Sequence, residues 1–229
     1  MTFDGVAVEI ERKPIKTLRL RVLPPDGRLR VSAPLGVSDN TIETFLQKHA
    51  VWIKRQQTRV AAQQPRTPLA YVTGEKITVM GRCYTLRICV SGKTRVEAVG
   101  DELLLFLPEQ STDVQRAAAV DRWRRCLLEG RIAVLTPKWE QSTGLRAEQW
   151  QIRQMTTRWG SCTPGTRRIR LNLQLTAFPT ECLEYVILHE LIHLRIPNHG
   201  KDFYVLMDRY MPDWRERKAL LNGKGRNNS

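Results

Sequence analysis

The sequence contains no long hydrophobic run, since no window holds the roughly 18 consecutive apolar residues that a membrane helix needs. Its first residues, MTFDGVAVEIERKP, contain no basic start followed by an apolar run and a small-residue cleavage site. A secretory signal peptide is therefore not expected. The five cysteines form no CxxC pair, which argues against a disulfide framework and against a zinc ribbon. We expect a cytoplasmic protein with reduced cysteines and no membrane partner.

Acidic residues are also scarce relative to basic ones, with 23 Asp and Glu against 37 Lys and Arg, for a formal net charge of +14. Such a surplus favours anionic partners, including nucleic acid and nucleotides. The basic residues are spread along the chain instead of forming a tail, and the same charge also keeps a protein soluble. Nucleic-acid association therefore stays an open alternative.

The first part of the chain is rich in expected strands. Val6 to Ile10, Leu18 to Leu23 and Leu29 to Ala33 alternate in strand fashion, and Pro24 to Gly27 predicts a hairpin turn. One helix should follow a cap at Ser38 or Asp39, and residues 65–68 are typical of a linker. Four more short strands are expected at residues 76–80, 84–90, 95–99 and 103–107.

The second part should be mainly helical. A long helix is expected to begin near Thr112 and run to about residue 135, where Pro137 ends or kinks it. Strands near residues 149–155 and 167–173 enclose the loop-rich segment R-W-G-S-C-T-P-G-T. Helices should follow at residues 179–195, 198–210 and 213–221. The order predicts the α+β class, with a β-rich N-terminal subdomain at residues 1–110 and a second subdomain at 111–229.

The segment Y-V-I-L-H-E-L-I-H-L contains an HExxH motif. His189 and His193 are four residues apart, so on a helix both imidazoles lie on one face and can reach one zinc ion. Glu190 is about 100° further around the helix, because an α-helix has 3.6 residues per turn. It can therefore act as the base toward the water that zinc activates, which is the chemistry of this motif.

His199 supplies the third ligand that a catalytic zinc site needs. Pro197 cannot continue the first helix, so the chain turns there and His199 can return toward the metal. Asp202 is the alternative third ligand. Three of the four histidines of the chain lie between positions 189 and 199. The sequence thus predicts a Zn²⁺ cofactor held by His189, His193 and His199, with Glu190 catalytic.

Several segments together resemble one family, and they are R-W-G-S-C at 158–162, I-R-L-N at 169–172, the HExxH segment, N-H-G-x-x-F at 198–203 and M-P-D-W at 211–214. The chain is similar to the YgjP-like zinc metallopeptidases, zincin-type proteins distantly similar to the SprT-like proteases. The resemblance covers most of the chain. It implies a zincin-like C-terminal part with a backing helix, a β-hairpin, the HExxH helix and further helices, and it implies the same ligand and base roles. Gly200 departs from the family pattern, where Ser is expected, and should only loosen the next helix start.

The R-W-G-S-C segment allows two interpretations. An edge strand beside the zinc could pair with an extended peptide, with Arg158 meeting a carboxylate or phosphate and Cys162 lining the site. Alternatively, Trp159 and Cys162 pack in the core and Gly160 permits a tight turn. The candidate substrate-binding residues are Arg158, Trp159, Ser161 and Tyr204.

The predicted function is that of a zinc-dependent metallohydrolase, with a peptide or protein substrate. One alternative keeps the same site but hydrolyses the phosphoanhydride of a nucleotide, with the basic residues near the hairpin gathering phosphates. A second alternative is a nucleic-acid-binding module with a structural zinc. Such a zinc would be closed by a fourth ligand, such as Cys162.

Overall fold

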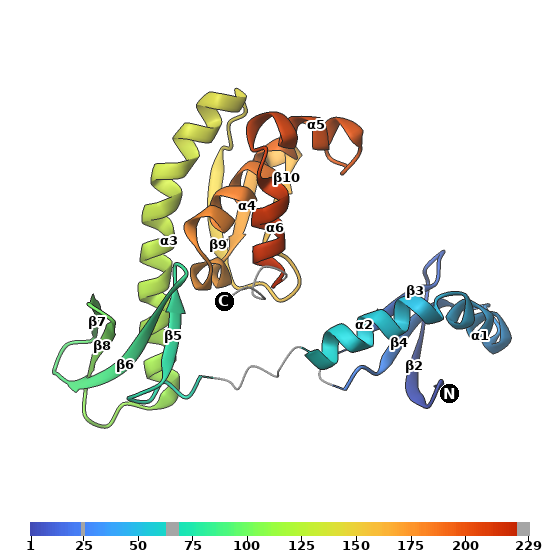
Figure 1. The fold of residues 1–229 in the computed structure, drawn as a ribbon, viewed down its shortest axis with the longest axis horizontal. Coiled ribbons are helices and arrows are strands. Elements are labelled where there is room, and N and C mark those ends of the chain that lie inside the picture. The colour runs from blue at the N-terminus through green and yellow to red at the C-terminus, as the bar shows by residue number, and fades with distance from the viewer. Residues whose placement is uncertain (24–25, 63–68, 224–229) are drawn as a thin grey trace. The chain divides into compact units, whose positions relative to one another are not determined.

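The computed structural model describes residues 1–23, 26–62 and 69–223, in two compact units, Met1–Pro68 and Leu69–Ser229. None of the helices in these described ranges combines the length and the apolar character of a membrane span. The α+β class is confirmed, since strands dominate the first part of the chain and helices the second (Figure 1).

The first unit is a four-stranded sheet with two helices. Its strands are β1 (Thr2–Phe3), β2 (Val6–Lys13), β3 (Arg19–Val22) and β4 (Leu29–Pro34), in the order β1-β2-β4-β3. Strand β4 is parallel to β2 and antiparallel to β3. Helices α1 (Asp39–Lys48) and α2 (Ala50–Ala62) complete the unit, and apolar residues of the strands and helices form one core, including Leu29, Val31, Ile42, Leu46 and Ile53.

The single helix expected in this unit is in fact two. Ser38 caps α1 as predicted, with its hydroxyl accepting from the Thr41 amide at 3.3 Å. The helix then ends at His49, whose φ of −105° and ψ of 10° leave the helical region. The expected turn between β3 and β4 is present where it is described, since the Gly27 amide donates to the Leu23 carbonyl. Pro24, Pro25 and the expected linker at 65–68 lie outside the described residues.

The second unit begins with another four-stranded sheet, which packs on a long helix. Strands β5 (Lys76–Val79), β6 (Arg82–Val90), β7 (Arg95–Val99) and β8 (Glu102–Leu107) lie in the order β5-β6-β8-β7. Helix α3 (Asp113–Thr143) starts with a capping box between Thr112 and Gln115. Ala119 and Val120 of α3 are buried in one core with apolar residues of this sheet.

The expectation that α3 ends near residue 135 at Pro137 is wrong, because the helix continues through Pro137 to Thr143. Proline removes one backbone hydrogen bond but leaves the following turns free to form when packing holds them. Trp139 provides that packing, being 6% exposed and donating its indole N–H to Glu184 at 3.1 Å. Gly144, in the left-handed conformation, ends the helix.

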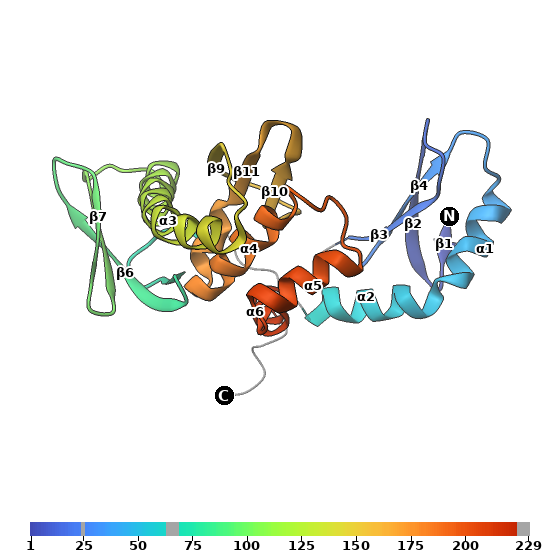
Figure 2. The same ribbon diagram turned by 90° about the horizontal axis from the view of Figure 1, so that it is seen from above.

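A three-stranded sheet and three helices complete the second unit. The sheet has the order β10-β11-β9, from β9 (Gln149–Arg153), β10 (Gly160–Thr163) and β11 (Arg168–Asn172). The short 3₁₀ helices η1 (Pro164–Thr166) and η2 (Leu173–Ala177) flank β11, and α4 (Thr180–Ile192), α5 (Lys201–Tyr210) and α6 (Trp214–Leu221) follow. Figure 2 shows α4 between this sheet and helices α5 and α6, all of which it contacts.

Part of the segment expected to be loop-rich is a strand. Gly160 to Thr163 pair antiparallel with residues 168–171 of β11, which makes β10 an edge strand. The boundary predicted near residue 110 falls inside the second unit, between β8 and α3. Helix α3 packs against the β5–β8 sheet through Ala119 and against the α4 core through Leu128 and Ile132. It therefore joins the segments on both sides of residue 110, and the division at that point stays a prediction.

Candidate metal centre

Helix α4 is a buried scaffold, because apolar residues surround it almost completely. Val186, Ile187, Leu188, Leu191 and Ile192 are each 2% exposed or less. A helix that is apolar all round belongs in the interior, and any polar group on it needs a partner there. Its three ionisable residues nearest the C-terminal end are His189, Glu190 and His193.

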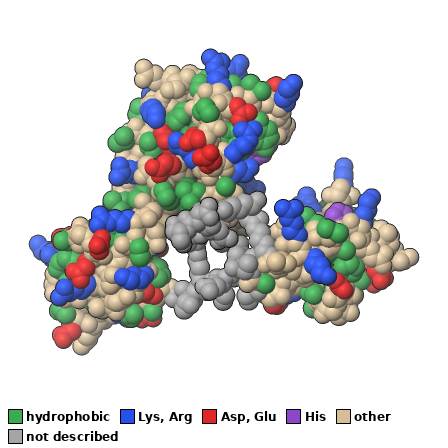
Figure 3. Space-filling view, viewed as in Figure 1, with side chains coloured by type: hydrophobic (Ala, Val, Ile, Leu, Met, Phe, Trp, Pro, Cys, Tyr) green, Lys and Arg blue, Asp and Glu red, His purple; other side chains and the backbone are tan. Residues whose placement is uncertain are grey.

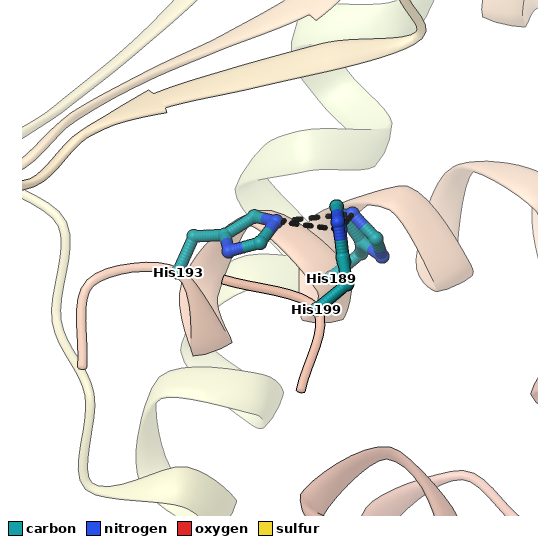
Figure 4. Close-up of side chains that lie close together, drawn as sticks. All are labelled: His189, His193 and His199. Atoms are coloured by element: carbon teal, nitrogen blue, oxygen red, sulfur yellow. Dashed lines mark hydrogen bonds between the residues drawn. The ribbon is translucent and has the colours of Figure 1, made fainter. Parts of the chain in front are cut away.

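The three histidines of the sequence motif meet at one point. The Nε2 atom of His193 lies 3.2 Å from that of His189 and 3.0 Å from that of His199, and the Nε2 atoms of His199 and His189 are 3.0 Å apart. Figure 4 shows the three rings converging on one space. His189 lies in the last turn of α4, His193 caps its C-terminal end, and His199 follows the Pro197 turn.

This geometry fits a single metal ion. Zinc–imidazole bonds of about 2.0–2.1 Å in a tetrahedral arrangement place ligand nitrogens about 3.4 Å apart. The observed Nε2 separations of 3.0–3.2 Å are close to that value. Nδ1 of His193 lies 2.9 Å from the Ile196 carbonyl oxygen, so this nitrogen donates and leaves the lone pair of Nε2 facing the other two rings. The arrangement therefore fits a cation better than a set of ordinary hydrogen bonds.

The surroundings favour the neutral form of His189 and His199, which is the form that binds a metal. Burial lowers the pKa of His189 to about 3, with His193 and His199 adding to the effect. Burial, followed by His193, also lowers the pKa of His199. Phe203 of α5 is fully buried, with its ring centre 4.8–4.9 Å from the centres of all three imidazoles. It forms an apolar floor beneath the cluster.

Glu190 is the buried carboxyl group of the site, with only 5% of its surface exposed. Burial raises its pKa to about 8, and the positive charge of Arg158 opposes that rise. A buried carboxylate is costly unless a positive charge lies near it. A cation at the three histidines would supply such a charge.

A cavity of about 500 Å³ opens over the histidines and Glu190. One wall is the segment from Arg158 through Cys162, which includes the start of the edge strand β10, and Pro164 follows on the same hairpin. The opposite wall comes from α4 and the turn after it, with Tyr185, Val186 and Pro197 beside the histidines. An edge strand beside the three histidines is the arrangement that one of the two interpretations of this segment predicted.

The candidate substrate-binding residues are only partly gathered here. Among the described residues the cavity lining includes Arg158, Trp159 and Ser161 but not Tyr204, whose ring stacks on Trp214 with centres 5.4 Å apart. The assignment of Tyr204 thus gains no support. Tyr185 lines the cavity instead, and its position four residues before His189 on the same helix was the available signal.

The two interpretations of the R-W-G-S-C segment are not exclusive. Trp159 lines the cavity and also packs edge-on against Phe178, with ring centres 5.0 Å apart. Cys162 lines the cavity while packing against the hydrophobic core, and burial raises the pKa of its thiol to about 11, aided by the charge of Glu190. Gly160 lies in β10 and not in a tight turn.

The possible additional ligands stand apart from the cluster. Among the described residues, the group of side chains that can share one ion consists of His189, His193 and His199, without Cys162 or Asp202. Asp202 is exposed in the first turn of α5. A set of three ligands leaves a coordination position open for water or substrate.

Comparison with known proteins places the chain in a family. No curated protein matches the chain. A solved structure, the metallopeptidase zymogen jannalysin of Methanocaldococcus jannaschii, is 28% identical over 41% of this chain and 88% of its own, with a TM-score of 0.37. The family model described as YgjP-like, metallopeptidase domain matches residues 16–224. The chain therefore belongs to the YgjP-like metallopeptidase family.

Proposed function

We propose that the protein is a zinc-dependent peptidase in which His189, His193 and His199 hold the metal and Glu190 is the general base. The observation that carries this proposal is the convergence of three Nε2 atoms, 3.0–3.2 Å apart, beside a buried carboxyl group on one cavity wall. Membership of a metallopeptidase family supports hydrolysis as the reaction class.

A bound zinc ion would polarise the scissile carbonyl and acidify a water molecule. The chain's own residues supply the other steps. Glu190 lies off the face of the ligand histidines, so one carboxylate oxygen can take the proton from the attacking water and pass it to the leaving nitrogen. Phe203, which is fully buried, packs against all three imidazoles and occupies the space on that side of them.

The substrate can be an extended peptide that pairs with the edge strand β10. Such a peptide would add a fourth strand through main-chain hydrogen bonds and lie along the cavity wall. Arg158 is exposed at that wall and suits a substrate carboxylate. Burial raises the pKa of Tyr185 to about 12, so near neutral pH its hydroxyl stays a hydrogen-bond donor. It is our candidate to stabilise the developing oxyanion.

A nucleotide phosphoanhydride is the second candidate substrate, because Arg158 would equally suit a phosphate at the cavity. A structural zinc in a nucleic-acid-binding module is less favoured, since the ligand group has three members and not four.

The basic surplus is shared by both units of the chain. Residues 1–68 carry 12 Lys and Arg against 6 Asp and Glu, and residues 69–229 carry 25 against 17. On the visible face, Lys and Arg are scattered among acidic side chains (Figure 3).

The deciding experiment is a substrate screen with zinc-loaded wild type and two variants, in which fluorogenic peptides are compared with nucleoside triphosphates. Glu190→Gln should keep zinc and fold but lose turnover by about 10²–10⁴-fold, because the amide cannot accept the proton. His189→Ala should lose zinc as well as turnover. Turnover of triphosphates alone would select the second candidate. Wild-type turnover by zinc-loaded Glu190→Gln would refute the role of Glu190.

A further inference from the structure

Gly160, the first residue of β10, lies directly against the side chain of Glu190. A Cβ atom added at Gly160 would lie 2.6 Å from Oε1, 2.7 Å from Cγ and 2.9 Å from Cδ of Glu190. Real Cβ atoms essentially never approach other heavy atoms within 3.0 Å. Gly160 is not among the residues of positive φ, so its backbone does not demand glycine. Glycine is required at this position because the Glu190 side chain occupies the space that a Cβ atom would need.

The backbone on each side of this contact is held in place. The backbone beside Gly160 is held by the Asn172 amide, which donates to the Trp159 carbonyl at 2.9 Å, and Gly160 itself is paired with Leu171 in the sheet. On the other side, Glu190 belongs to a buried helix whose next residue, Leu191, is fully buried. A side chain at position 160 would therefore displace the Glu190 side chain more readily than either backbone.

The alternation of β10 explains how the strand can lie so close to α4. Residues 160 and 162 share one face of the strand, because side chains alternate along it. Cys162 packs against the core on that face. Burial raises the pKa of its thiol, and the nearby charge of Glu190 adds to that rise. Gly160 is the residue before Cys162 on this face, and it has no side chain. The carboxyl group of Glu190 fills the space that a side chain there would take.

We propose that Gly160 is the positioning residue of Glu190: the missing side chain fixes where the carboxylate lies in the cavity beside the three histidines. This inference rests on the proposed role of Glu190 as the base. Gly160 acts through Glu190, and its effect on turnover comes from the place of the carboxylate. Because Gly160 also begins the edge strand, the same contact sets the base in register with any peptide that pairs with β10.

The contact can be tested without activity, by thermal unfolding of the metal-free full-length protein. Gly160→Ala should lower the midpoint by about 4 °C or more, since overpacking in a protein of this size has such effects. The loss should persist in the Glu190→Gln background, where the side chain has the same shape. It should almost vanish in the Glu190→Ala background, which removes all three crowded atoms. Gly165→Ala, in the same hairpin with nothing within 4 Å, is the matched control and should change little.

The consequence for catalysis is tested on zinc-loaded protein with the substrate found above. Gly160→Ala should keep its zinc and its KM while kcat falls by about 10–100-fold, because a base displaced by about 1 Å loses that much. Should Gly160→Ala not fold, folding of the Gly160→Ala/Glu190→Ala double variant would support the proposal.

Two results would overturn the inference. Equal destabilisation by Gly160→Ala in the wild-type and Glu190→Ala backgrounds would show that the crowding has another cause. An unchanged kcat despite thermal coupling would show that the contact does not position the base. Neither result depends on whether Glu190→Gln loses turnover, so failure of this inference and failure of the proposed function can be told apart.

Discussion

Nδ1 of His193 is hydrogen-bonded to the carbonyl oxygen of Ile196, three residues further along, at 2.9 Å. The Ile196 amide in turn donates to the Ile192 carbonyl at 2.9 Å, and Pro197 follows at once. The turn that returns His199 to the cluster is therefore the turn that orients His193. When a histidine binds a metal through one ring nitrogen, a hydrogen bond from the other ring nitrogen fixes its tautomer and its ring orientation.

His193→Ala should abolish metal binding. The wild type is expected to hold about one zinc per chain after dialysis, whereas the variant should hold almost none, because two histidines cannot complete a catalytic zinc site. Added zinc should also raise the thermal midpoint of the wild type but not of the variant, because zinc can stabilise the folded state only when it binds to it. Mass spectrometry and thermal unfolding measure both effects. His49→Ala, whose ring bonds the Phe45 carbonyl in the first unit, is the control, and equal zinc in all three proteins would remove His193 from the ligand set.

Asn172 should be essential for the loop that carries Arg158 and Trp159. Its side chain is almost fully buried, and its Nδ2 donates to the carbonyls of Met155 and Arg158, both at 2.8 Å. Asn172→Ala leaves these groups without their partner, so we expect a loss of about 2–4 kcal/mol in the free energy of unfolding. Faster amide exchange should appear in residues 155–159.

The matched control for Asn172 is Gln174→Ala, whose side chain is exposed. It should change the free energy of unfolding by less than about 0.5 kcal/mol. Equal stability of Asn172→Ala and the wild type in urea unfolding would show that the loop is held by other contacts.

Glu184 should stabilise the protein at neutral pH, and this contribution should be lost in acid. Burial favours its protonated form, but hydrogen bonds from Lys138 and Arg217, at 2.7 and 2.6 Å, outweigh that effect and lower its pKa. A carboxyl group with a lowered folded pKa contributes stability above its unfolded pKa of about 4.3 and loses it as the pH falls through the folded value. Glu184→Gln should therefore destabilise at pH 7, by about 1–3 kcal/mol, and the difference from wild type should shrink below about pH 4.

Chemical unfolding of metal-free wild type and Glu184→Gln at several pH values measures this difference. Removing the metal excludes the separate effect of protonating its ligands. Glu97→Gln is the control, because its bond to Arg95 is exposed and should contribute less than about 1 kcal/mol at any pH. A constant gap between Glu184→Gln and the wild type from pH 7 to pH 3 would contradict the assignment.

The cluster of three histidines was predictable from the sequence because its determinants are local. Four-residue spacing places His189 and His193 on one face, and Pro197 predicts the turn that returns His199. The contact of Glu190 with Gly160 was not predictable, since it joins residues 30 apart in the sequence through the packing of β10 on α4. Strand β10 itself has little apolar alternation and forms because β11 pairs with it.

The length of α3 and the identity of the tyrosine in the cavity lining also depend on long-range packing, so they could not be predicted from the sequence. Pro137 indicates a helix end locally, but the burial of Trp139 overrides it. Tyr185 and Tyr204 both stack on Trp214, and the place of Tyr185 in the cavity lining is what separates them. Long-range packing also explains why the β5–β8 sheet lies in one unit with the three histidines.

Gly81 links the β5–β8 sheet to the start of α4, the helix that carries His189 and Glu190. It follows Met80, whose amide donates to the Thr176 carbonyl at 2.6 Å, and a Cβ at Gly81 would lie 2.8 Å from Cγ of Pro179, the N-cap residue of α4. Its φ of +79° also disfavours any side chain. Gly81→Ala therefore combines a backbone cost with a clash against a rigid ring.

Gly100→Ala separates these two costs, because Gly100 has a φ of +56° in the turn after β7 but nothing within 4 Å. It should lose about 1–2 kcal/mol of unfolding free energy from the left-handed backbone alone. Gly81→Ala should lose about 1–3 kcal/mol more, from overpacking against Pro179. Urea unfolding of both variants measures the difference. Equal losses would mean that the turn does not press on Pro179.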